Sequence, residues 1–245
     1  MKSGLFRHRD GTERLWFEPS DIESMMEEEL KNAKLYPPLQ SPAVDIERFI
    51  EQYLVANLDQ YGELEEGILG LTEFIPGRSP RLVINRNLTG AIDADATPMG
   101  TRGRWRATLA HEASHVIMHS VLFQLGTDQP ELFRVSTASN PNRLLRCEKK
   151  NVLFRGGGTD WREVQANMAM AALLMPRGLF RKAVVEAKKE LQIDPSRSGL
   201  DPASIRELTK CLSSKFEVSK QAAGIRLEVL GCVPVGGQLG MESIR

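Results

Sequence analysis

The sequence is organised around Trp105-Arg106-Ala107-Thr108-Leu109-Ala110-His111-Glu112-Ala113-Ser114-His115. Apolar residues recur at helical spacing through and beyond this stretch, which predicts one helix over about residues 104–125. Residues four positions apart lie on the same face of a helix, so the imidazoles of His111 and His115 point to the same side. Two imidazoles arranged in this way can bind one metal ion.

The five residues from His111 to His115 form an H-E-x-x-H pattern, which is typical of zinc peptidases. Glu112 lies beside the first predicted ligand, where its carboxylate can reach a water on the metal rather than the metal itself. Zinc lowers the pKa of such a water to about 7, and the glutamate accepts its proton as the water attacks a peptide carbonyl. The pattern therefore predicts a zinc-dependent hydrolase with Glu112 as the general base. The competing interpretation is a solvated helix face with unliganded histidines.

A catalytic zinc needs a third protein ligand and an open fourth position. His119 lies two turns from His111, about 12 Å along the axis, so a contact with the last helix carbonyls is its simpler explanation. Cys147 lies in a long predicted loop, and most lone cysteines are inert. Glu163 begins an apolar helix in which a buried carboxylate needs a cation, but together with Asp160 it also matches a capping box. The spacing alone leaves the third ligand open.

The segments before the H-E-x-x-H helix predict an α+β protein with a short sheet. Residues 68–75 and 81–85 are short apolar runs that predict two strands joined by a turn. Residues 42–54 show the apolar spacing of a helix. Residues 89–103 and 126–159 are polar or rich in small residues, and we expect both to be loops.

The composition of the chain divides it into three parts. Residues 1–40 are polar and acidic, and we expect a peripheral extension with a short helix that begins near residue 20. Residues 41–180 are expected to form the metal-binding domain, and residues 181–245 a helical region. A buried helix is predicted over residues 160–175, because that stretch is apolar almost all round.

Two predicted helices near the C-terminus, residues 204–215 and 219–230, have the spacing of a DNA-binding helix-turn-helix. Ser219 is the expected N-cap of the second helix, and Gly231 is expected to end it. Residues 201–231 contain five basic and four acidic residues, and the whole chain contains 32 of each kind. Phosphate binding requires a basic excess. Direct binding of nucleic acid is therefore not expected, and a helical cap or a docking surface for a protein is favoured.

Length and composition are ordinary for a globular protein. The 245 residues suffice for one large or two small domains, and hydrophobic residues make up 41% of them. We expect no membrane span and no signal peptide, because no stretch is apolar enough and the first residues are polar. The three cysteines are widely spaced and odd in number. They do not predict a disulfide framework, so the cytoplasm is the expected location.

Several of these segments, taken in order, resemble the ImmA/IrrE family of metallo-endopeptidases. Arg106 to His115 resembles the family's R-F-T-L-A-H-E-L-G-H helix, and residues 163–176 are similar to its E-x-x-A-N-x-F-A-A-x-L-L-M-P helix. Residues 82–85 resemble the strand before the active-site helix, and residues 216–231 resemble a C-terminal F-x-V-S…R-L-x-x-L-G segment. The resemblance extends over about residues 40 to 231.

The resemblance implies a small zincin-like metallopeptidase domain with an active-site helix, followed by a helical region. It implies zinc held by His111, His115 and Glu163, with Glu112 as the base, and so favours Glu163 among the three candidates. Described members of the family cleave helix-turn-helix repressors, which implies a repressor or a similar regulatory protein as substrate. The alternative is a regulatory module that binds protein or DNA through its C-terminal helices, with little or no proteolysis.

Overall fold

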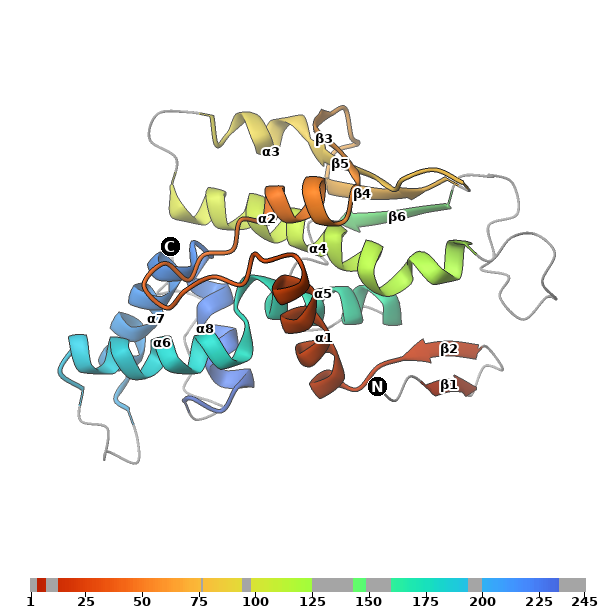
Figure 1. Cartoon of the computed structure of the whole chain (residues 1–245). Helices are drawn as coiled ribbons and strands as arrows, with labels where there is room; N and C mark the ends of the chain where they lie inside the picture. Colours follow the sequence, from red (N-terminus) through yellow and green to blue (C-terminus); the bar gives the residue numbers. More distant parts are fainter. Residues whose placement is uncertain are drawn as a thin grey trace.

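The computed structural model describes residues 4–7, 13–75, 77–93, 98–124, 143–148, 160–193 and 200–233. Within these residues the fold is α+β, with a small sheet and many helices (Figure 1). The strands are β1 (Gly4–Arg7), β2 (Glu13–Trp16), β3 (Asn57–Gly62), β4 (Ile68–Phe74), β5 (Arg81–Asn85) and β6 (Arg143–Glu148). The helices are α1 (Pro19–Asn32), α2 (Ile46–Arg48), the π-helical turn η1 (Phe49–Tyr53), α3 (Arg86–Gly90), α4 (Met99–Gln124), α5 (Trp161–Leu174), α6 (Arg177–Glu190), α7 (Pro202–Phe216) and α8 (Lys220–Val229).

The main sheet has four strands in the order β3-β5-β4-β6, and β1 and β2 form a separate antiparallel pair. The two predicted strands are confirmed as β4 and β5, and they pair antiparallel. Strand β3, which pairs with β5 in parallel, was not predicted. Its sequence, Asn-Leu-Asp-Gln-Tyr-Gly, is mostly polar because β3 is an edge strand with one partner, where polar side chains discourage further pairing.

Strand β6 corrects the prediction of an uninterrupted loop over residues 126–159. It pairs antiparallel with β4 and forms the other edge of the sheet. Leu145 and Cys147 are buried on it, as expected for residues two apart on one face of a strand. The isolated sequence gives little sign of this strand, because its pairing with β4 joins segments far apart in the chain. The rest of the predicted loop lies outside the described residues.

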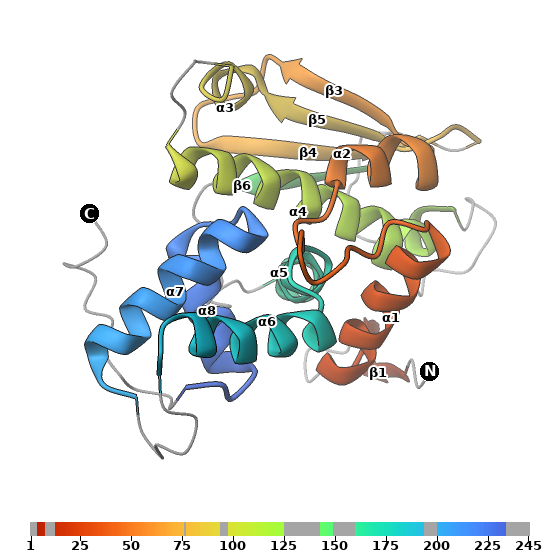
Figure 2. The same ribbon diagram turned by 60° about the vertical axis from the view of Figure 1, so that its left-hand side comes forward.

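Helix α4 lies between the sheet and α5, so that one of its faces meets β4 and another meets α5 (Figure 2). It begins at Met99 rather than at the predicted Arg104, and the short helix α3 occupies part of the predicted loop 89–103. A Cβ added to Gly103 would lie 2.5 Å from the backbone nitrogen of Ser219, so glycine there lets α4 approach the start of α8 closely.

Helix α1 corrects the prediction that residues 1–40 are peripheral. Ile22, Met26 and Leu30 recur at four-residue spacing and are fully buried. They belong to the same hydrophobic core as the rest of the protein, and α1 packs on α5. The acidic residues that made the segment look peripheral occupy the other faces of an amphipathic helix.

The hydrophobic core is continuous from α1 to the C-terminal helices. It includes Ile22 of α1, Phe49 of η1, Leu109 of α4, Met170 of α5 and Phe216 of α7. This core crosses both expected domain boundaries, near residues 40 and 180, and those boundaries stay predictions. Among the helices that the structure describes, none is both long and apolar enough to cross a membrane.

Candidate metal centre

His111 and His115 lie one turn apart on the face of α4 that meets α5, and both are fully buried. Their Nε2 atoms lie 3.1 Å from each other. The helix therefore directs both imidazoles to one point, as the four-residue spacing predicted. The alternative of a solvated helix face is wrong, because neither ring is exposed.

Glu163, in the first turn of α5, faces this pair. Its Oε2 lies 3.2 Å from Nε2 of His111, and its Oε1 lies 3.3 Å from Nε2 of His115. One ligand atom from each of the three residues lies within 4.8 Å of the other two, so the group could hold a metal ion. The capping-box alternative does not describe this glutamate. Asp160 caps α5 by accepting a hydrogen bond from the backbone nitrogen of Arg162, while the Glu163 carboxylate turns to the histidines.

Two neighbours orient the histidines, and the sequence did not identify either of them in this role. Nδ1 of His111 lies 3.1 Å from Oδ1 of Asn167, and Nδ1 of His115 lies 3.0 Å from Nδ1 of His119. If each Nδ1–H donates to its neighbour, both Nε2 atoms keep a free lone pair toward Glu163. His119 is buried within α4, so it is a support for His115 and not a helix-end residue.

The carboxylate of Glu112 lies between this group and the sheet, where it contacts β4. Thr72 of β4 donates a hydrogen bond to its Oε2. A Cβ added to Gly70 would lie 2.5 Å from its Oε1, so only glycine at this position of β4 leaves room for the carboxylate. Oε1 is buried without a hydrogen-bond partner among the described residues. Burial raises the pKa of Glu112 to about 7, although His111 and Thr72 oppose the shift.

The ionised carboxylate of Glu163 and the neutral imidazole of His115 are in the forms that bind a metal cation. Burial disfavours the ionised form of Glu163, but hydrogen bonds from His111 and His115 hold its pKa well below the usual range. Burial lowers the pKa of His115, which favours the neutral, metal-binding imidazole. Burial also opposes protonation of His111, but Cys147, Glu163 and Glu112 outweigh it and raise the pKa of this imidazole well above the ordinary value. A buried anionic pocket that attracts a proton in this way also attracts a divalent cation.

Cys147, a candidate third ligand in the sequence, reaches the same region from β6. Its side chain is fully buried and interacts with the side chains of His111 and Glu112. It is not a member of the group whose ligand atoms all lie within 4.8 Å of one another. The structure thus brings Glu163 to the two histidines and Cys147 to the edge of the group.

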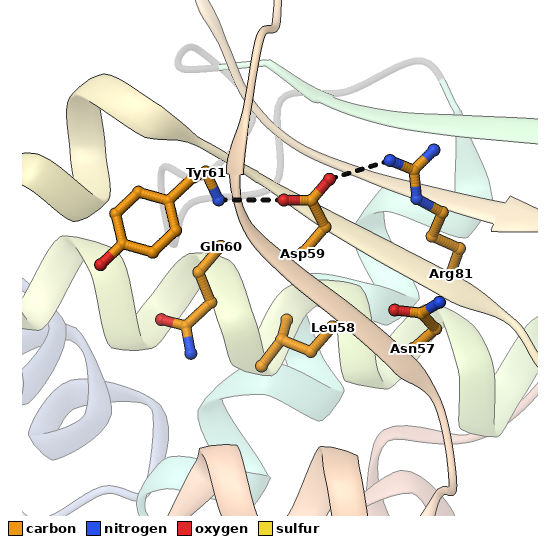
Figure 3. A pocket seen from close by; sticks show the side chains of 6 residues that line it. All are labelled: Asn57, Leu58, Asp59, Gln60, Tyr61 and Arg81. Carbon is orange, nitrogen blue, oxygen red and sulfur yellow. Dashed lines mark hydrogen bonds and ion pairs between the residues drawn. The ribbon is translucent and has the colours of Figure 1, made fainter.

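A separate surface hollow of about 500 Å³ lies at the β3 edge of the sheet, opposite the edge formed by β6 (Figure 3). Within it, Asp59 accepts hydrogen bonds from the backbone nitrogen of Tyr61 and from the guanidinium of Arg81. It shares no residue with the metal-binding group, so we assign it no part in that centre. Its lining consists of Asn57, Leu58, Asp59, Gln60, Tyr61 and Arg81.

Comparison of the chain with known proteins finds no matching family model, no matching curated protein and no matching solved structure. An activity can therefore be proposed only from the geometry of the site and from the sequence motifs.

Proposed function

We propose that this protein is a zinc-dependent endopeptidase. One observation carries the proposal: the imidazoles of His111 and His115 converge with the carboxylate of Glu163 in a buried group that could hold a metal ion. Two histidines and one carboxylate are a common ligand set for catalytic zinc, and three protein ligands leave a fourth position for water or substrate. The neighbouring carboxylate of Glu112 is not needed as a ligand and so is available for proton transfer.

Bound zinc would supply a Lewis acid that polarises the peptide carbonyl and acidifies the attacking water. Glu112 accepts the proton of that water and later delivers it to the leaving amine nitrogen. Thr72 donates to Oε2 of this carboxylate and leaves Oε1 for the proton. Asn167 and His119 hold the two ligand imidazoles in the tautomer that presents Nε2.

The resemblance of the sequence to the ImmA/IrrE family makes a transcriptional repressor, or a similar regulatory protein, the first substrate to test. A zincin-like domain and a cytoplasmic location belong to the same proposal. These proposals are supported by the two spaced motifs, which supply all three ligands and the base.

The alternative, a DNA-binding module built from α7 and α8, is less well supported. The N-terminus of the second helix, which would enter the major groove, is covered by α4, since Gly103 packs against the backbone of Val218 and Ser219. Arg226, one of the basic residues of this region, is buried and donates to both carboxylate oxygens of Glu23. It is therefore not available to bind a phosphate.

The first test measures bound zinc in the purified wild type and in Glu163→Ala, followed by cleavage of a labelled casein and of a purified helix-turn-helix repressor. About one zinc per chain is expected in the wild type and much less in the variant. Glu112→Gln should keep zinc and lose cleavage, whereas Glu207→Gln, an exposed carboxylate on α7, should change neither. A wild type that takes up no zinc on reconstitution would overturn the proposal, and so would a Glu112→Gln variant that cleaves at the wild-type rate.

A further inference from the structure

Cys147 is a buried nucleophile that the peptidase chemistry does not use. It lies on β6, directly across from Gly70 of β4, and its side chain is fully buried. The other two cysteines, Cys211 and Cys232, are partly exposed. Strand β6 lies along α4 in both views of the molecule, which brings this thiol to the helix of the two ligand histidines (Figures 1 and 2).

The surroundings of this thiol are polar, unlike those of an inert core cysteine. It interacts with the side chains of His111 and Glu112. A second, independent feature lies at the same place: Oε1 of Glu112 is fully buried and has no hydrogen-bond partner among the described residues. This oxygen faces Gly70, the residue paired with Cys147. A soft sulfur donor and an unpartnered carboxylate oxygen therefore meet beside one of the metal ligands.

We propose that the thiol of Cys147 binds the metal as a fourth protein ligand. With four protein ligands the metal has no position left for water, so the peptidase is held in an inactive resting form. This inference rests on the proposed function, because it concerns the same metal. Two imidazole nitrogens, one carboxylate oxygen and one thiolate sulfur form a tetrahedral set that suits zinc. Four protein ligands are typical of closed sites, and three of sites that bind water.

Closing the centre requires a small movement, because the sulfur is not yet among the atoms that lie within 4.8 Å of one another. Strand β6 is an edge strand whose only strand partner is β4, so its backbone can shift more easily than that of a central strand. In the closing step the water leaves the fourth position, the S–H bond of Cys147 breaks, a sulfur–metal bond forms, and the proton passes to the Glu112 carboxylate. In the opening step the sulfur–metal bond breaks, the proton returns to sulfur, and the fourth position becomes available to water.

Cobalt(II) in place of zinc distinguishes the two forms of the centre. Thiolate bound to cobalt gives an intense near-ultraviolet charge-transfer absorption, and imidazole and carboxylate ligands alone do not. We expect this absorption in the cobalt-loaded wild type, in Cys211→Ser and in Cys232→Ser, and its loss in Cys147→Ser. The visible bands of bound cobalt should remain in Cys147→Ser, because the other three ligands are intact. Cys147→Ala serves as a second variant if the serine hydroxyl disturbs the buried site, and circular dichroism checks that each variant is folded.

The outcomes separate this inference from the proposed function. One cobalt per chain without a charge-transfer band in the wild type would overturn the fourth ligand and leave the three-ligand centre intact. No cobalt in any variant, with every variant folded, would overturn both. Casein cleavage by zinc-loaded Cys147→Ser should be faster than by the wild type, since its fourth position is always open. Equal rates, with the band present, would overturn the resting form.

Discussion

The replacement Gly70→Ala tests the position of the proposed base without touching a metal ligand. The new Cβ would lie 2.5 Å from Oε1 of Glu112 and 2.8 Å from Cγ2 of Thr108, well inside van der Waals contact. If the carboxylate stays in place, the overpacking costs about 1–3 kcal/mol. If it moves away, it loses the hydrogen bond from Thr72, which is worth about 1.5–3 kcal/mol to a charged acceptor.

Replacing glycine within a strand returns roughly 0.5–1 kcal/mol, because the unfolded chain loses freedom. The net expected loss in the free energy of unfolding of Gly70→Ala is therefore about 1–2 kcal/mol, measured by urea denaturation of the metal-free protein. A carboxylate displaced by about 1 Å should lower the cleavage rate of the folded enzyme about 100-fold. Zinc content should not change, because the atoms nearest the new Cβ belong to Glu112 and Thr108.

Two control variants separate the loss of the base from general damage to the sheet. In Gly62→Ala the added Cβ collides with the side chain of Val83, away from the metal centre, so stability should fall while the rate of the folded enzyme is kept. In Gly90→Ala the Cβ meets no atom within 4 Å, so the cleavage rate should be kept and stability should rise by roughly 0.5–1 kcal/mol. Wild-type cleavage by Gly70→Ala at unchanged stability would refute either the position of Glu112 or its role as the base.

Three further experiments test other contacts of the fold and the site. Arg226→Met leaves the carboxylate of Glu23 without its buried partner and should lower the free energy of unfolding by about 3–5 kcal/mol in urea. Lys215→Met removes an exposed ion pair and should cost much less. Equal losses would contradict the joining of α1 to α8 by this contact. His119→Phe keeps an aromatic ring but removes the nitrogen that contacts Nδ1 of His115. Zinc affinity, measured against a competing chelator, should therefore fall about 10–100-fold. Unchanged affinity would show that His119 does not support His115. Zinc at about 1,000 times its Kd should stabilise the wild type by about 4 kcal/mol in thermal unfolding. Glu163→Ala at the same zinc concentration should lose most of that gain. An equal gain in both proteins would point to another zinc site.

Local patterns were enough to predict the convergence of the two histidines and the central strands, whereas the role of Glu112 as the base stays a prediction. The four-residue spacing of His111 and His115 is a property of one helix, so it needs no tertiary information. The same holds for β4 and β5, which are apolar, short and separated by a turn. The capping of α8 by Ser219 and its end at Gly231, which has a positive φ, were also predicted correctly.

Segments whose role depends on distant partners were predicted less well. Strand β6 was not predicted, because its pairing with β4 joins parts of the chain far apart in sequence. Helix α1 was predicted to be peripheral, because its acidic composition masks an apolar face that α5 covers. In each case a contact made in the folded chain outweighed the preference of the local composition.

The sequence by itself determined that two imidazoles share one face of a helix that also carries Glu112, and that a second, apolar helix carries a glutamate in its first turn. It left the third ligand open among Glu163, His119 and Cys147, and only the resemblance to a family ranked them. The packing of α5 on α4 decided that Glu163 meets the histidines, that His119 supports one of them, and that Cys147 approaches from β6. The physical reason is the distance along the sequence over which each effect acts. Helical periodicity fixes only neighbours within about one turn. Contacts between residues tens of positions apart form only when the core brings their elements together.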